Sequence, residues 1–157
     1  METNLKLRES AASSDLVDPT MYRQLIGSLM YLVNTRPDIC YAVSALSQFM
    51  CEPRHIHLVA AKHILRYLRG TIGYGLKYTY SANMKLQGYN DSDWAESVTD
   101  RKSTSGCCFS LGSAMISWCS RKQNFVALST VEAEYIATCV ATREAVWLQK
   151  LLAGLFG

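Results

Sequence analysis

The spacing of apolar residues changes once along this chain, near residue 70, from a helical period to strand-like alternation. Before that point, apolar residues recur at intervals of three and four, as they do on one face of an α-helix. After it, apolar and polar residues alternate, and a long helical pattern returns near the C-terminus. The sequence therefore predicts an α+β fold, in which a helical segment precedes an antiparallel sheet covered by one long helix.

Three helices are predicted in the first half, near residues 20–34, 37–50 and 54–69. Pro37 both ends the first helix and opens the second. Residues 1–18 lack an apolar period and are interpreted as a tail. The faces that we expect the three helices to bury consist of Leu25, Leu29, Leu32 and Val33, then Ile39, Val43 and Leu46, then Leu58, Ala61, Leu65 and Leu68.

The second half contains four runs typical of strands. Thr104–Leu111 and Ala114–Ser120 are separated by only Gly112 and Ser113, which predicts a tight hairpin. Gly75–Tyr80 and Leu86–Asp91 also alternate. We expect Gly75–Tyr80 to fold back on Leu86–Asp91 and cover the edge of that strand, which would otherwise expose backbone groups.

A long helix is predicted from about Thr130 to Leu152. Ser129, with Glu132 three residues later, fits a capping box at its start. The change of period divides the chain into a helical segment, residues 19–72, and an α+β segment, residues 73–157.

Composition excludes several classes of protein. The chain has 157 residues, of which 49% are hydrophobic, enough to bury the core of one or two small units. The N-terminus lacks the apolar run of a signal peptide, and no stretch reaches the length of a membrane span. We therefore expect an intracellular protein, cytoplasmic or nuclear, with no membrane partner. The six cysteines form no CxxC pair and are predicted to be small buried residues.

Two groups of carboxylates are candidates for a metal site. Strand alternation places Asp91 and Asp93 on the same side of their strand. At about 100° per residue, Glu134 lines up with the apolar stripe of the last helix, whereas Glu132 lies almost opposite. The members of that stripe are Ala137, Ala141, Ala145, Leu148 and Leu152. Carboxylates brought together at a sheet end can share Mg²⁺. The alternative is turn chemistry at Asp91 and a favourable helix dipole at the glutamates.

Three long stretches of the sequence follow one another in an order that is typical of one family. They are YRQLIGSLMYLVNTRPDICYAVSALSQFM, then HLVAAKHILRYLRGT, then GYNDSDWAESVTDRKSTSGCCFSLGSAMISWCSRKQNFVALSTVEAEYIATCVATREAVWLQKLL. The first two resemble the thumb of the reverse transcriptase in copia-type retrotransposon Pol polyproteins. The third resembles the opening of the ribonuclease H domain in the same polyproteins. The resemblance covers roughly residues 20–155.

The resemblance implies particular catalytic residues. The first catalytic aspartate of the family lies in the motif that reads DSDWA here, which is Asp91, and the catalytic glutamate lies in EAEY, which is Glu134. The family also has a third catalytic aspartate on a fourth strand, and a polymerase palm, without counterparts in this sequence. We therefore expect Asp91 and Glu134, with Asp93 as a further candidate ligand, to hold Mg²⁺ weakly. The chain alone is expected to be inactive.

Basic residues form two candidate surfaces for nucleic acid. His55, Lys62, Arg66 and Arg69 fall on one stripe of the third helix, where a polymerase thumb could follow the phosphates of a duplex. The alternative is an ordinary solvated helix face. The resemblance implies that a second group, which flanks the hairpin, lies near the nucleic-acid groove. That group consists of Arg101, Lys102, Arg121 and Lys122.

Three functions stay open on the sequence. The chain could be an enzyme part within a longer Pol polyprotein, whose ancestral activities are RNA-directed DNA synthesis and cleavage of RNA in RNA–DNA hybrids. It could instead bind a hybrid or duplex without cutting it, or act through protein contacts after adoption by a host. The expected partners are such a nucleic acid, the rest of a Pol polyprotein, and a second copy paired along the edge of residues 86–91.

Overall fold

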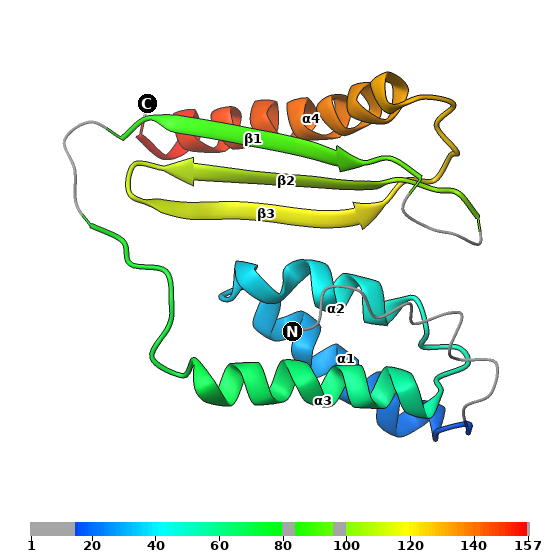
Figure 1. The fold of residues 1–157 in the computed structure, drawn as a ribbon. Coiled ribbons are helices and arrows are strands. Elements are labelled where there is room, and N and C mark those ends of the chain that lie inside the picture. The colour runs from blue at the N-terminus through cyan, green and yellow to red at the C-terminus, as the bar shows by residue number, and fades with distance from the viewer. Residues whose placement is uncertain (1–14, 80–83, 96–99, 157) are drawn as a thin grey trace. The chain divides into compact units, whose positions relative to one another are not determined.

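The computed structural model describes residues 15–79, 84–95 and 100–156. Within these residues the fold is α+β, as predicted, with α-helices and one three-stranded antiparallel sheet (Figure 1). Contacts along the chain divide it into two compact units, Met1–Gly75 and Leu76–Gly157. Each unit has its own hydrophobic core. None of the described helices is both long enough and apolar enough to cross a membrane.

The first unit contains the three predicted helical segments. They are α1 (Pro19–Val33), α2 (Cys40–Ser47) and α3 (His55–Gly70), and a short 3₁₀ helix, η2 (Pro37–Ile39), leads into α2. The side chain of Asp18 caps α1 by accepting a hydrogen bond from the backbone nitrogen of Thr20.

Apolar side chains from all three helices form the core of the first unit. The fully buried members are Tyr22, Ile26, Leu29, Ile39, Val43, Leu46, Ala61 and Ile64. The predicted stripe of Ile39, Val43 and Leu46 is confirmed. Of the predicted face of α3, Ala61 is fully buried, and Leu58 and Leu68 are partly buried. Leu65 is the wrong member, because it is 42% exposed and its neighbour Ile64 is fully buried instead. The buried line of α3 is His57, Ala61 and Ile64, which lie four and then three residues apart.

His57 is buried because it completes the start of α3. Its Nδ1 accepts a hydrogen bond of 3.0 Å from the backbone nitrogen of Arg54, and its ring stacks on Phe49 with centroids 3.8 Å apart. Residues just before α1 meet the same helix end. Leu16 forms a β-bridge with Arg54, and the backbone nitrogen of His55 donates to the carbonyl of Asp15. The described end of the predicted tail is therefore packed against α3.

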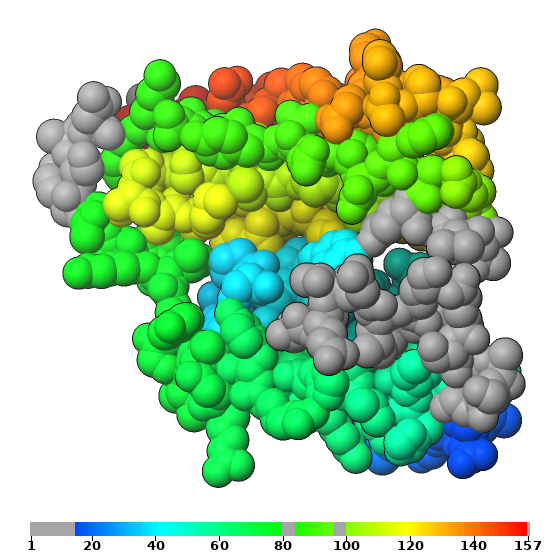
Figure 2. Space-filling model, in the orientation of Figure 1, coloured from blue at the N-terminus to red at the C-terminus, as the bar shows by residue number. Residues whose placement is uncertain are grey.

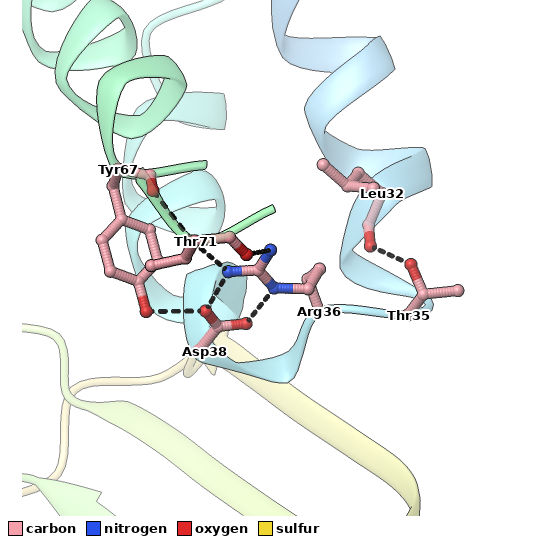
Figure 3. A network of polar contacts seen from close by, with 6 residues as sticks. All are labelled: Leu32, Thr35, Arg36, Asp38, Tyr67 and Thr71. Atoms are coloured by element: carbon pink, nitrogen blue, oxygen red, sulfur yellow. Dashed lines mark hydrogen bonds and ion pairs between the residues drawn. The ribbon is translucent and has the colours of Figure 1, made fainter. Parts of the chain in front are cut away.

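A polar network joins η2 to the end of α3 (Figure 3). Arg36, only 8% exposed, binds Asp38 through two nitrogens, at 3.0 and 2.7 Å. Its guanidinium also donates to the carbonyl and hydroxyl oxygens of Thr71 at 3.1 and 2.8 Å. The hydroxyl of Tyr67 donates to Asp38 at 2.8 Å. The hydrogen bonds from Arg36 are the main reason that the pKa of Asp38 lies below its usual value.

The second unit is an antiparallel meander followed by a helix. The strands are β1 (Leu86–Asp93), β2 (Thr104–Leu111) and β3 (Ala114–Lys122), in the spatial order β1-β2-β3, and α4 (Thr130–Phe156) follows. The predicted hairpin is confirmed, and Gly112 in its turn has a positive φ of 61°. The helix ends four residues later than the sequence analysis predicted.

The prediction of a strand at Gly75–Tyr80 is wrong for the residues that can be described. Residues 75–79 form no strand. Instead, the hydroxyl of Tyr78 donates to the carbonyl of Met115, and the backbone nitrogen of Thr79 donates to Ser113 Oγ. Tyr80 and residues 81–83, which would connect this segment to Leu86–Asp91, fall outside the described residues. The segment thus meets the turn between β2 and β3 and the start of β3. No strand in the described part of the chain covers the outer edge of β1.

The core of the second unit lies between the sheet and α4. Phe109, Ala141 and Leu148 are buried there, and Leu86, Cys107, Ile116 and Ala145 pack around them. The helix packs chiefly against β1 and less against β2. In the space-filling view, the orange and red atoms of α4 lie along the outer side of the green strand β1 (Figure 2).

The prediction that the cysteines are buried is not confirmed. Cys51 and Cys139 are exposed, and the other four are only partly buried. Of these, Cys107 packs against the core of the second unit.

Candidate functional site

The two faces of β1 carry different side chains. Asn90 Nδ2 donates to Thr138 Oγ1 on α4 at 3.0 Å, and Ser92 Oγ accepts from Gln123 Nε2 at 3.3 Å. These even-numbered residues therefore face α4. Alternation places Asp91 and Asp93 on the opposite face of the sheet, where both are exposed.

Glu134 reaches the end of β1 from the first turns of α4. Its Oε1 accepts a hydrogen bond of 3.2 Å from the backbone nitrogen of Ser92. Among the described strands, β1 lies at the edge of the sheet and pairs with β2 alone, so this N–H points outward from the free edge. The carboxylate of Glu134 thus lies next to the peptide bond between Asp91 and Ser92.

Glu132 has a different position and a structural role. Its Oε2 accepts from the backbone nitrogen of Leu128 at 2.7 Å, and its own nitrogen donates to Ser129 Oγ at 3.2 Å. These bonds cap the start of α4. The prediction that Glu134 faces the sheet and Glu132 points away is therefore confirmed.

A cation shared by Asp91 and Glu134 would have to lie at the edge of β1. Alternation puts Asp91 on the face of the sheet opposite α4, whereas Glu134 lies on the side of α4. The expected meeting of the two carboxylates on one face is therefore not found. The donor chemistry fits Mg²⁺, because both groups offer exposed or half-exposed carboxylate oxygens. No cluster of three or more His, Cys, Asp or Glu side chains suited to a metal occurs within residues 15–79, 84–95 and 100–156. The shared cation stays a prediction.

The turn after β1 is held by side chains from elsewhere in the unit. Trp94 Nε1 donates to the carbonyl of Ala127 at 3.1 Å, and the nitrogen of Ala95 donates to the buried Ser103 Oγ at 3.1 Å. Ala95 has a positive φ of 51°, a conformation that side chains other than glycine seldom adopt. These contacts fix where β1 ends, and hence where Asp91 and Asp93 stand.

Gln123 is a site residue that the sequence analysis missed. It follows β3 directly and is only 6% exposed. Its Nε2 contacts Ser105 Oγ at 2.8 Å and the carbonyl of Ala133 at 2.9 Å, in addition to Ser92. No spacing rule marks a glutamine after a strand as buried, so only the tertiary structure reveals these contacts.

The four basic residues predicted on α3 are all exposed on that helix; they are His55, Lys62, Arg66 and Arg69. The second basic group is more mixed. Arg101 and Arg121 are exposed, whereas Lys102 is half-buried. Lys122 Nζ forms an ion pair of 2.8 Å with Asp100, which partly neutralises its charge.

The chain is similar to several known proteins. It is 51% identical over 128 residues to a protein of Plasmopara viticola named secreted RxLR effector protein 161, a match that covers 81% of this chain and 90% of that protein. It is 46% identical over 144 residues to the retrovirus-related Pol polyprotein from transposon RE1 of Arabidopsis thaliana, which covers 92% of this chain and 10% of the polyprotein. The corresponding Pol polyprotein from transposon TNT 1-94 of Nicotiana tabacum is 47% identical over 135 residues, covering 85% of this chain and 10% of the polyprotein.

These matches extend across both units of the chain. No protein-family model matches the sequence, and no solved structure matches it. The chain spans about a tenth of the length of the two plant Pol polyproteins. Identities of 46–47% over 85–92% of this chain nevertheless place it with those proteins. The chain belongs to the family of retrovirus-related Pol polyproteins of copia-type transposons.

Proposed function

We propose that the second unit is the opening of a ribonuclease H-like domain and works within a longer Pol polyprotein on RNA–DNA hybrids. In this proposal, Asp91 and Glu134 supply two of the carboxylates of a Mg²⁺ site. The order of elements supports it: an antiparallel meander precedes a helix, the DSDW sequence ends the first strand, and the glutamate opens the helix.

One observation carries the proposal: Glu134 Oε1 lies 3.2 Å from the backbone nitrogen of Ser92. This bond holds the carboxylate at the level of Asp91 and at the exposed end of the sheet. Glu132, by contrast, bonds to the backbone nitrogen of Leu128 and caps its own helix.

When bound at such a site, Mg²⁺ supplies positive charge that stabilises the charge developing on a phosphate during hydrolysis. The chain's own contribution is to orient two carboxylate oxygens at a place open to a large substrate. Two carboxylates hold the ion weakly and fix its position poorly, and positioning supplies much of the rate of such reactions. We therefore expect the chain alone to bind hybrid without cutting it at a measurable rate.

We further propose that α3 holds the phosphates of the hybrid through His55, Lys62, Arg66 and Arg69. All four side chains are exposed on one helix, and the lysine and the two arginines form no ion pair with another residue in the described ranges. Each phosphate neutralised by a basic side chain contributes about 0.9 to the slope of log affinity against log salt. The double variant Arg66→Ala/Arg69→Ala should therefore lower that slope by up to about two.

The test is a salt titration of a fluorescent RNA–DNA hybrid in the presence of Mg²⁺. The matched control is Arg143→Ala/Lys150→Ala, which removes two exposed positive charges from α4 and none from the proposed surface. If both double variants show the same slope of log affinity against log salt, binding depends only on the net charge of the chain. That result would contradict the proposed surface on α3. Cleavage of the hybrid by the wild-type chain would contradict the expectation of inactivity.

The similarity to the Plasmopara viticola protein favours a second candidate function. This chain covers 90% of that protein, whose name describes an effector and not a Pol polyprotein. A non-catalytic protein that acts through contacts with other proteins would fit the similarity to this effector. The same titration separates the candidates, because such a protein need not bind hybrid with a salt slope that depends on α3.

A further inference from the structure

The buried side chain of Gln123 lies where β1, β2 and α4 come together. Its backbone nitrogen donates to the carbonyl of Ser103 at 2.8 Å, which fixes the residue just beyond the end of β3. From there, its Nε2 reaches Ser92 on β1, Ser105 on β2 and the carbonyl of Ala133 on α4. One amide nitrogen therefore contacts three secondary-structure elements.

The orientation of this amide is fixed by its contact with the helix. The carbonyl of Ala133 can only accept a hydrogen bond, so the NH₂ group of Gln123 must face it. Flipping the amide would place Gln123 Oε1 against the carbonyl oxygen of Ala133, and two acceptors cannot form a hydrogen bond. In the present orientation, Gln123 Oε1 is buried and has no hydrogen-bond partner among the described residues. An unpaired buried oxygen is unfavourable, so the contacts of the nitrogen outweigh that cost.

Gln123 contacts the two residues that hold Glu134 in place. Ala133 directly precedes Glu134, and Ser92 is the residue whose N–H Glu134 accepts. Both residues are thus held by the same amide. We propose that Gln123 is the positioning residue of this site: it fixes the first turns of α4 against the ends of β1 and β2, so that Glu134 lies beside the peptide bond between Asp91 and Ser92. The link to Mg²⁺ rests on the proposed function, whereas the positioning of Glu134 does not.

The main test is hydrogen exchange of the Ser92 amide, measured by NMR in the full chain without Mg²⁺. Gln123→Met keeps the length of the side chain, removes its donors and also removes the unpaired Oε1, so this variant should fold. We expect its Ser92 amide to exchange roughly tenfold faster than in the wild type, as it should in Glu134→Ala, which removes the acceptor. Ser117→Ala is the matched control. It removes a different hydrogen bond between the sheet and α4, from Ser117 Oγ to Glu144 Oε1 at 2.8 Å.

The control separates positioning from general stability. Ser117→Ala should lower the melting temperature but leave the Ser92 amide protected. If Ser92 exchanges equally fast in Ser117→Ala and Gln123→Met, the role of Gln123 is merely structural and the inference is overturned. An unchanged Ser92 amide in Gln123→Met would overturn it as well. The wild-type chain gives a test that needs no variant, because the side-chain amide protons of Gln123 must show nuclear Overhauser effects to Ala133, and their absence would refute the contact.

A Mg²⁺ titration of the same samples keeps the two proposals distinct. The wild type should show a saturable Mg²⁺-dependent shift at Ser92, and Gln123→Met should need a several-fold higher concentration to reach it. If the wild type does not respond to Mg²⁺ while the exchange results hold, the proposed function fails and the positioning of Glu134 by Gln123 stands.

Discussion

Gly88→Ala should destabilise the second unit, because Gly88 is the residue of β1 that opposes Phe109 on β2. A Cβ atom at Gly88 would lie 2.4 Å from Phe109 Cε1 and 2.7 Å from Cδ1. Carbon atoms in contact normally lie about 3.5–4.0 Å apart. The ring must therefore move by about 1 Å, although it is only 3% exposed and packed against Ala141 and Leu148.

The expected magnitude follows from two opposing effects. Crowding of a packed core typically costs about 1–3 kcal/mol. Replacing glycine by alanine also restricts the unfolded chain, which stabilises the fold by about 0.4–1 kcal/mol. Gly106→Ala is the matched control, because a Cβ at Gly106 meets no atom within 4 Å. The effect on the unfolded chain is common to both variants, so their difference should be about 1–3 kcal/mol.

Urea unfolding followed by tryptophan fluorescence measures this difference. The three tryptophans, Trp94, Trp118 and Trp147, all belong to the second unit, so the signal reports that unit alone. Equal stability of Gly88→Ala and Gly106→Ala would refute the assignment of the faces of β1. Asp91 would then no longer be placed on the side opposite α4, and the geometry of the proposed site would fail with it.

Two further predictions concern groups with altered pKa values. Hydrogen bonds from Arg36 are the main reason that the pKa of Asp38 is lowered in the folded state. The ionised carboxylate therefore stabilises the first unit at any pH above its unfolded pKa of about 3.9. This stabilisation is lost as the pH falls through the lower pKa of the folded state. Asp38→Asn should therefore lower the free energy of unfolding of the first unit by about 1–2 kcal/mol at neutral pH. It should also make the NMR amide signals of α3 less sensitive to acid, and an unchanged dependence of these signals on pH would contradict the prediction. Burial, with a smaller effect of Cys119, raises the pKa of Cys107 to about 11. A thiol reagent at pH 8 should therefore label the exposed Cys51 and Cys139 well before Cys107, as peptide mass spectrometry would show, and equally fast labelling would contradict the burial of Cys107.

The periodic parts of the fold were predictable because one face of each element is buried. The bounds of α1 and of the hairpin follow from the spacing of apolar residues and from Pro37 and Gly112. The same reasoning distinguished Glu134 from Glu132, because a helix turns by a fixed angle per residue. These features depend on neighbours in the sequence.

The features that could not be predicted depend on distant contacts. In α3, apolar residues occupy adjacent positions, so spacing alone does not decide between Ile64 and Leu65; the packing of α1 and α2 does. Residues 75–79 alternate like a strand, but Tyr78 and Thr79 bond to the region of the hairpin turn instead. The role of Gln123 comes from three contacts with residues 10 to 31 positions away.

The central claim is that Asp91 and Glu134 together bind a divalent cation at the edge of β1. The Ser92 amide is a direct reporter, because its hydrogen bond to Glu134 Oε1 must change when that carboxylate binds an ion. The measurement is a Mg²⁺ titration followed by NMR at constant ionic strength, in the wild type, Asp91→Asn, Glu134→Gln and the control Glu132→Gln. A saturable shift of Ser92 in the wild type and in Glu132→Gln, strongly weakened in the other two variants, is the predicted result. A shift that does not saturate, or that survives in Asp91→Asn and Glu134→Gln, would contradict the claim.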